Sequence, residues 1–284
     1  MIEQNLNNFK NIVFNDDVFN VLKSLPDKCV DMIYSDPDYN VGIKYNNKSY
    51  TKNFDEYIEW YIELAKESLR VLEDDGNMFL INYPKQNSYL WVKYLDKACY
   101  DVHEYVWVYN TNVGHSPKKF TTAHRTILHC RKTKDNKWYK DEVAEPFLNP
   151  TDKRILKNIA NGSKGRMPYS WLYYNLVKNV SKDKTIHACQ IPSGLVEKLF
   201  NASTKENDLI FIHFGGSGNE IMLAKQMKRN FISTEIDKVY YKMILDRLKN
   251  NGAIPKEYKL KLYKIPVTEN YNLFVQDKKR KRNK

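Results

Sequence analysis

One segment, residues 208–235, constrains the fold more than any other part of the sequence. The apolar run Leu209–Ile212 leads into the glycine-rich stretch Gly215–Asn219 and then into a helical-looking stretch, Ile221–Arg229. A second apolar run follows and ends in the acid Glu235. Strand, glycine-rich turn, helix, strand and terminal acid is the order in which an α/β nucleotide-binding unit is built. The glycines allow the backbone to approach a ligand, and Glu235 can accept hydrogen bonds from both ribose hydroxyls.

The rest of the chain repeats the same alternation of strand-like and helical segments. Strands are expected at residues 10–15, 30–35, 76–82, 102–109, 126–131, 209–214 and 230–235. A helix is expected at residues 55–72, because Trp60, Leu64, Leu69 and Leu72 recur at roughly helical spacing. This rhythm predicts an α/β fold with a mostly parallel sheet and helices on both faces.

The expected strand at residues 30–35 ends in a candidate catalytic motif, Asp36-Pro37-Asp38-Tyr39-Asn40. A strand delivers such side chains to the rim of a sheet, where a carboxylate, a backbone carbonyl and a flat ring can face one planar ligand. The same residue types also begin ordinary turns. Taken alone, the motif is therefore as consistent with an ordinary turn as with a nucleobase-binding site.

A polar loop, His187-Ala188-Cys189-Gln190-Ile191-Pro192, precedes the glycine-rich segment. It leads into a helix that carries Leu195, Leu199 and Phe200 on one face. Considered without the other motifs, this segment is interpreted as a capped helix of the hydrophobic core.

In this order, the motifs resemble those of the β-class amino-group DNA methyltransferases, which use S-adenosylmethionine to methylate N6 of adenine or N4 of cytosine. Residues 36–39 resemble the family's Asp-Pro-Pro-Tyr motif, residues 187–192 its His-Pro-Thr-Gln-Lys-Pro segment, and residues 212–219 its cofactor loop. Asp17 stands at the family's opening acidic turn. A trailing base-pocket segment of the family is matched by Asn110, Asn112, Phe120 and His124.

The resemblance implies a Rossmann-like methyltransferase fold with S-adenosylmethionine as cofactor and no metal. The catalytic residues would be Asp36, Pro37 and Tyr39. Asp36 and the Pro37 carbonyl would accept hydrogen bonds from the target amino group, and Tyr39 would stack on a flipped base. The implied cofactor-binding residues are Asp17, Val18, Asp36, Gln190, Phe214, Gly216, Ser217, Gly218, Asn219 and Glu235.

The first residue of the motif bears on the target base. Within the family, motifs that begin with Asp mostly serve adenine, so Asp36 favours site-specific N6-adenine methylation of duplex DNA. Three alternatives remain: a cytosine-N4 enzyme, a catalytically impaired methyltransferase-like protein that binds DNA, and an RNA methyltransferase.

Four positions depart from the family pattern. Asp38 replaces the second proline, Ile212 and His213 replace an Asp-Pro pair, and Asn219 replaces a common threonine. Asn can still cap a helix, so the last change is mild. Losing the loop acid removes a contact to the methionine amino group that the family has, which keeps a weakened or inactive enzyme among the alternatives.

The charge and composition of the chain are consistent with a protein that binds double-stranded DNA. The 284 residues carry a formal net charge of +12, which suits a polyanionic partner. The rhythm of strands and helices breaks at residues 138–184, where basic and aromatic residues mix, so this stretch is expected to be a small target-recognition insert. The expected DNA-binding residues are Asn40, Lys118, Lys119, Arg125, Lys164 and Arg166.

These expectations divide the chain into four parts. Residues 1–137 form the first part of the catalytic core, 138–184 the insert, 185–275 the second part of the core with the cofactor loop, and 276–284 a basic tail. The four cysteines have no metal-ligand spacing, and neither a signal sequence nor a membrane span is recognisable, so a cytoplasmic protein is expected. A homodimer is a family expectation, and pairing with a cognate restriction endonuclease is left open.

Overall fold

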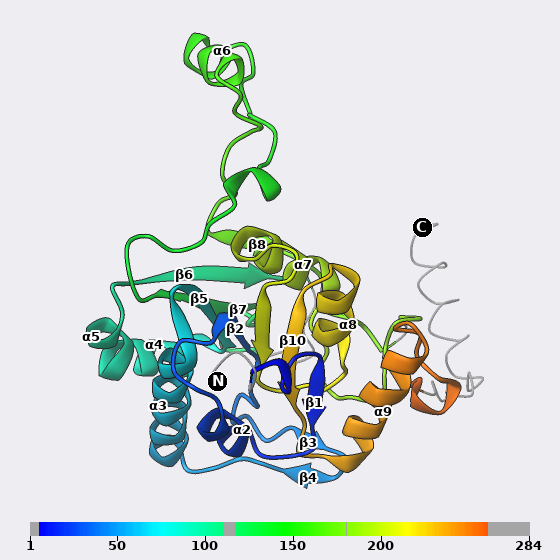
Figure 1. The fold of residues 1–284 in the computed structure, drawn as a ribbon. Helices are drawn as coiled ribbons and strands as arrows, with labels where there is room; N and C mark the ends of the chain where they lie inside the picture. Colours follow the sequence, from blue (N-terminus) through cyan, green and yellow to red (C-terminus); the bar gives the residue numbers. More distant parts are fainter. Residues whose placement is uncertain (1–5, 111–116, 180, 261–284) are drawn as a thin grey trace, which may run out of the picture.

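A computed structural model describes residues 6–110, 117–179 and 181–260. In this part of the chain, a mixed eight-stranded sheet forms the centre, helices cover both of its faces, and a small hairpin of β3 and β4 lies at one end (Figure 1). The strands are β1 (Ile12–Phe14), β2 (Val30–Ser35), β3 (Lys44–Tyr45), β4 (Lys48–Ser49), β5 (Leu72–Asn82), β6 (Asp101–Val108), β7 (His124–Arg131), β8 (Trp171–Tyr173), β9 (Leu209–Ile212) and β10 (Asn230–Thr234). The predicted α/β fold with a mostly parallel sheet is confirmed.

Helices fall between most of these strands, as the sequence predicts. They are α2 (Val18–Ser24), α3 (Phe54–Val71), α4 (Pro84–Leu90), the π-helical turn η1 (Trp91–Leu95), α5 (Asp96–Ala98), the 3-10 turn η2 (Lys140–Glu142), α6 (Lys153–Ala160), α7 (Ser193–Ser203), α8 (Asn219–Gln226), α9 (Lys238–Lys249) and the 3-10 turn η3 (Lys256–Tyr258). Among the described residues, no helix has both the length and the apolar character that a membrane crossing requires.

The strand order, β1-β10-β9-β2-β5-β7-β6-β8, divides the sheet into two halves. From β1 to β5 all neighbouring strands are parallel, whereas β7 runs antiparallel to both β5 and β6. Beyond β2 the chain moves through α3 to β5, and beyond β9 it moves through α8 to β10 on the other side. The adjacent strands β2 and β9 therefore mark the point at which the winding of the sheet reverses, where open α/β sheets bind their ligands.

Alternation along the central strands builds two cores, one on each face of the sheet. On β2, Ile33 packs into the core formed with α2 and α3, whereas Met32 and Tyr34 pack into the core formed with α7 and α8. On β9, Phe211 and Ile212 divide in the same way. Strands buried on both faces read as continuous apolar runs, which explains why these two were recognisable in the sequence.

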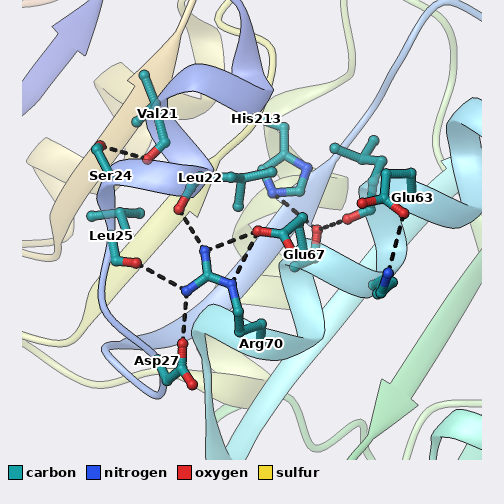
Figure 2. Close-up of polar contacts among 12 residues, drawn as sticks. Val21, Leu22, Ser24, Leu25, Asp27, Glu63, Glu67, Arg70 and His213 are labelled. Atoms are coloured by element: carbon teal, nitrogen blue, oxygen red, sulfur yellow. Dashed lines mark hydrogen bonds and ion pairs between the residues drawn. The ribbon is translucent and has the colours of Figure 1, made fainter.

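Arg70, near the end of α3, holds the end of α2 in place (Figure 2). Its guanidinium donates hydrogen bonds to the carbonyl oxygens of Leu22 and Leu25, at 2.7 and 3.0 Å, and forms ion pairs with Asp27 and Glu67 at 2.8 and 2.9 Å. These carbonyls belong to the last turn of α2, where a cation is favourable. The opposite end of α2 begins at the predicted cofactor residue Asp17, so this contact fixes the helix that carries it.

Residues 138–184 depart from the layered core, as the change of rhythm in the sequence indicates. Figure 1 shows α6 on a protrusion beyond β8 and α7, at the opposite end of the molecule from the hairpin of β3 and β4. None of the α6 residues is buried, while Trp171–Tyr173 returns to the sheet and pairs with β6. The assignment of this stretch as a recognition insert stays a prediction, as do the four domain boundaries. Asn112 and the basic tail lie outside the described residues.

Candidate active site

A cavity of about 470 Å³ opens at the edge of the sheet where the parallel strands β1, β2, β9 and β10 end. Its volume is that of a small-molecule site. Most of the catalytic and cofactor-binding residues predicted from the sequence line it, although they follow four separate strands. The lining includes Asp17, Val18, Asp36, Pro37, Tyr39, Phe214, Gly216, Ser217 and Glu235.

The glycine-rich loop and the acid at the end of β10 are joined directly. The backbone N–H of Gly216 donates a 2.8 Å hydrogen bond to the Glu235 carboxylate. Gly216 has a φ of 51°, in the left-handed region, and a side chain there would meet the His187 ring at 3.1 Å. Burial raises the pKa of Glu235 to about 7. The loop thus lies close against an acid that can accept ribose hydroxyls.

Three predicted cofactor residues support the cavity without lining it. Gln190 accepts a hydrogen bond from the Thr185 N–H at 3.2 Å and donates one to the Asp183 carbonyl at 2.9 Å. Asn219 donates to the Ile191 carbonyl at 3.1 Å, which ties the cofactor loop to the polar segment before α7. Gly218, with a φ of 75°, begins α8. The polar segment and the glycine loop are therefore one structural unit.

Asp36 follows β2 directly and lies in the cavity wall with Pro37 and Tyr39. Burial of the carboxyl raises the pKa of Asp36 to about 7, against the opposing effects of a hydrogen bond from the Tyr39 hydroxyl and of the nearby Arg125 charge. Gln86 donates a 2.6 Å hydrogen bond to the Tyr39 carbonyl. The motif is thus held from several sides and presents a carboxylate to the cavity.

Asp38, which stands where the family has a second proline, stabilises the bend that follows β2. Its carboxylate accepts a 2.8 Å hydrogen bond from the backbone N–H of Asn40, which has a φ of 58°. Its carbonyl accepts a 2.6 Å hydrogen bond from the Tyr57 hydroxyl. An Asp that binds the backbone two residues on makes its own turn, so the side chain replaces the stiffness of a proline. Asn40 in turn pairs through its side chain with the backbone of Lys52, at 2.6 and 3.0 Å.

Two further departures, Ile212 and His213, are core residues. Both are fully buried, and Ile212 packs with the core that contains α7 and α8. The His213 backbone N–H continues the ladder to the Tyr34 carbonyl at 3.1 Å, and its ring lies 3.4 Å from the Ser68 hydroxyl (Figure 2). Burial lowers the pKa of His213 to about 3, so the ring is neutral. Neither residue lines the cavity.

Arg125, predicted to contact DNA, is half-buried beside the catalytic motif. Its guanidinium lies 3.7 Å from the centre of the Tyr83 ring and 5.3 Å from that of Tyr39. It also donates hydrogen bonds to the Tyr109 hydroxyl and, at 3.1 Å, to the His124 carbonyl. Such stacked arginines hold aromatic rings in position. The contact of Arg125 with DNA stays a prediction.

The remaining predicted DNA contacts lie away from the cavity lining. Lys118, Lys119 and Lys164 are exposed. Arg166 forms a 2.7 Å ion pair with Glu145 and lies over the ring of Tyr169 at 4.3 Å. These two contacts make Arg166 part of the packing at the base of the protrusion.

Acidic residues dominate the cavity wall. Of the residues that the structure describes, one lysine, Lys52, lines the cavity, together with seven acids: Asp16, Asp17, Asp36, Asp38, Glu220, Glu235 and Asp237. Among the described residues, no group of His, Cys, Asp and Glu side chains is arranged to hold a metal ion. The field in the cavity therefore favours an organic ligand that carries positive charge. Glu220 was missed from the sequence, where its signal was an acid directly after Asn219, in the first turn of α8.

The model of a DNA methylase family, N6/N4 methylases, matches residues 30–246. The chain is 27% identical over 272 residues to the type II methyltransferase M.BglII of Bacillus subtilis, covering 89% of this chain and 74% of that protein. It is 25% identical over 245 residues to the DNA adenine methyltransferase YhdJ of Escherichia coli (strain K12), covering 83% and 82%.

Solved structures share the fold. The PvuII DNA methyltransferase (cytosine-N4-specific) superimposes with a TM-score of 0.63 and 18% identity, covering 93% of this chain and 92% of that one. The complex of M1.HpyAVI with S-adenosylmethionine gives a TM-score of 0.56 and 22% identity, covering 83% and 98%.

Proposed function

Because this chain belongs to the N6/N4 DNA methylase family, whose members are S-adenosylmethionine-dependent DNA amino-methyltransferases, we propose that it methylates N6 of adenine in duplex DNA. The observation that carries the proposal is the Asp36 carboxylate at the wall of the cavity, adjoining Pro37 and Tyr39. Motifs that begin with Asp mostly serve adenine in this family. The relative YhdJ is named as an adenine methyltransferase, which agrees with this choice.

The cavity suits S-adenosylmethionine in both shape and charge. The Gly216 loop permits close approach of a ligand, and Glu235 offers a carboxylate for ribose hydroxyls. We propose that Asp17, Val18 and Phe214 complete the site, with the acid-rich wall favouring the cationic ligand. When bound, S-adenosylmethionine supplies a methyl group made electrophilic by its sulfonium.

The chemistry proposed for this chain's residues follows from the properties of an exocyclic amine. Its lone pair is delocalised into the ring, so the nitrogen must be drawn towards a tetrahedral shape before it can attack. Asp36 and the Pro37 carbonyl, accepting hydrogen bonds from the amino group, do this and aim the lone pair at the methyl carbon. The nitrogen–carbon bond forms as the carbon–sulfur bond breaks, sulfur keeps the electron pair, and the nitrogen loses its extra proton to Asp36 or solvent.

A base must leave the duplex to reach this cavity. We propose that Tyr39 stacks on the flipped base and thereby offsets an unstacking cost of about a few kcal/mol. Lys118 and Lys119 are the proposed backbone contacts, and the 138–184 protrusion is the proposed reader of flanking duplex, since α6 lies far from the hairpin beside the cavity (Figure 1).

Two partners are proposed at the level of the family. A homodimer follows the family expectation, and the type II methyltransferase relatives make a cognate restriction endonuclease a natural partner. Because the substrate is DNA, we expect the protein to act in the cytoplasm.

The proposal is tested by incubating the purified protein with radiolabelled S-adenosylmethionine and unmethylated bacterial DNA, followed by digestion to nucleosides. We expect the label in N6-methyladenine. Label in N4-methylcytosine would mean that the target base is cytosine rather than adenine. Label that appears only in an RNA substrate would overturn the assignment of DNA as the substrate.

A further inference from the structure

Glu220, the second residue of α8, is a buried carboxyl that faces the cofactor cavity. Its residue is 5% exposed and contributes to the cavity wall. In the described part of the chain, the only hydrogen bond to its carboxyl comes from its own backbone N–H, and no Lys or Arg forms an ion pair with it. A carboxylate in this state is costly unless something positive pairs with it.

The groups around Glu220 supply that charge only in part. Asp36, at the end of β2, adds a second negative charge, and the buried Tyr34 hydroxyl on the same strand is neutral. Arg247 of α9 attracts Glu220, but its guanidinium donates hydrogen bonds to the carbonyls of Ser217 and Gly252. Burial outweighs this attraction and raises the pKa of Glu220 to about 8.

Four of the acids in the cavity wall form two interacting pairs. Glu220 interacts electrostatically with Asp36, beside the transfer site, whereas Glu235 interacts with Asp237 beyond the end of β10. Glu235 already accepts hydrogen bonds from the backbone N–H groups of Gly216 and Asp237, both at 2.8 Å. Among the described residues, Glu220 therefore has no ion pair and no hydrogen bond from another residue, and the more distant Arg247 is the cation that attracts it.

We propose that Glu220 senses the charge of the bound cofactor and makes the cavity prefer S-adenosylmethionine over the demethylated product, S-adenosylhomocysteine. This inference rests on the cofactor assignment and is independent of the target base. The two ligands share their adenosine, ammonium and carboxylate groups, and differ by one methyl group and one positive charge. Loss of the methyl group therefore removes the attraction to Glu220 and weakens binding of the product.

The effect acts through space, so it needs no direct contact with the sulfonium. Charges separated by several ångströms still interact strongly in a partly buried cavity, where the effective dielectric constant is about 20. A cationic ligand also favours the ionised form of the carboxyl. Binding of S-adenosylmethionine near neutral pH should accordingly release a proton, and binding of the neutral thioether should release fewer.

Calorimetric titration of the full chain without DNA tests the proposal. The ligands are S-adenosylmethionine, S-adenosylhomocysteine and sinefungin, in which a protonated amine replaces the sulfonium. We expect the unaltered protein to bind both cationic ligands about tenfold more tightly than the thioether. Glu220→Gln should reduce this preference by at least about fivefold, mainly through weaker binding of the cations. Glu197→Gln, on the exposed face of α7, should leave all three affinities unchanged.

Two results would overturn the proposal. One is an unchanged preference in Glu220→Gln, and the other is an equal loss of affinity for all three ligands, which would mean a purely structural role. If Glu220→Gln does not fold, the same titrations of Glu220→Ala decide. The unaltered protein at pH 6 and pH 9 gives a further check, because the preference must grow as Glu220 and the cavity acids Asp36 and Glu235 ionise, and a constant preference across this range contradicts the proposal. The titrations contain no DNA and therefore measure cofactor binding alone. A failure of the protein to methylate adenine would appear only in the methylation assay, so the two proposals can fail independently.

Discussion

The Tyr39 hydroxyl donates a hydrogen bond to the Asp36 carboxylate, within the bend that follows β2. Tyr39 is held in turn by the edge of Tyr83, with ring centres 5.4 Å apart, and by the Arg125 guanidinium. The carboxylate that we propose as acceptor for the target amino group thus has a fixed orientation before substrate arrives. Such preorganisation is the main way in which enzymes stabilise developing charge.

Catalytic efficiency should depend on pH through acids whose pKa values are raised by burial. The pKa is about 7 for Asp36 and Glu235 and about 8 for Glu220. Each must be ionised to act as proposed, so kcat/KM for the cofactor should be highest above pH 8 and should fall increasingly steeply below pH 7. A pH profile of initial methylation rates measures this. If kcat/KM stayed constant down to pH 5, none of these three carboxyls would have the raised pKa that its burial is expected to cause.

Tyr39→Phe should move this profile towards higher pH. The hydroxyl hydrogen bond stabilises the ionised form of Asp36, so its removal raises the pKa of that carboxyl. Activity at pH 7 should fall several-fold and recover at pH 9, because the ring that stacks on the base is retained. Tyr100→Phe, an exposed tyrosine, is the matched control. An unshifted profile in Tyr39→Phe would show that the hydroxyl does not tune Asp36.

Gly216→Val should abolish close approach of the cofactor while leaving the fold in place. The residue combines a φ of 51° with a His187 atom 3.1 Å from any added Cβ. We expect the affinity for S-adenosylmethionine to fall by at least about tenfold. Gly162→Val introduces similar backbone strain at a φ of 86°, with no atom within 4 Å, and should not affect cofactor binding. Equal affinities in the two variants would contradict the assignment of the glycine loop.

Much of the architecture could be predicted because the central strands are buried on both faces. Val30–Ser35 is the strand expected from its apolar run, and α3, at Phe54–Val71, lies within one residue of the expected 55–72. The short strand β8 and the two-residue strands β3 and β4 were not expected. Strands of two or three residues are too short to carry a periodic signal, and what makes them strands is pairing with distant or turn-linked neighbours.

The sequence predicted those residues of the candidate site whose type and spacing point to one role. It predicted less well the residues whose role depends on where the fold places their side chains. Gly216 and Glu235 follow from the order strand, glycine turn, helix, strand and acid. Asn219 and Gln190 come from the same motifs, yet they brace the loops behind the cavity. Glu220 escaped notice because an acid in the first turn of a helix is ordinarily a favourable, solvated residue. Only its burial against the cavity reveals otherwise.

Arg70→Met should destabilise the protein, because it leaves the last carbonyls of α2 and two acids without their cation (Figure 2). We expect a loss of about 2 kcal/mol in the free energy of unfolding, measured by urea denaturation. Lys66→Ala, which removes an exposed ion pair of 3.6 Å with Glu63, should cost less than about 0.5 kcal/mol. Equal stability of the two variants would mean that Arg70 does not anchor α2.

The role of Asp36 is tested most directly by comparing methyl transfer with cofactor binding in Asp36→Asn. An amide lacks the negative charge that draws the amino group into shape, so single-turnover methylation of adenine should fall by about 10²- to 10⁴-fold. The affinity for S-adenosylmethionine should stay within about tenfold, since the glycine loop and Glu235 remain. Asp135→Asn, at an exposed position, controls for the loss of one charge. Near-normal methylation by Asp36→Asn would contradict the proposed mechanism.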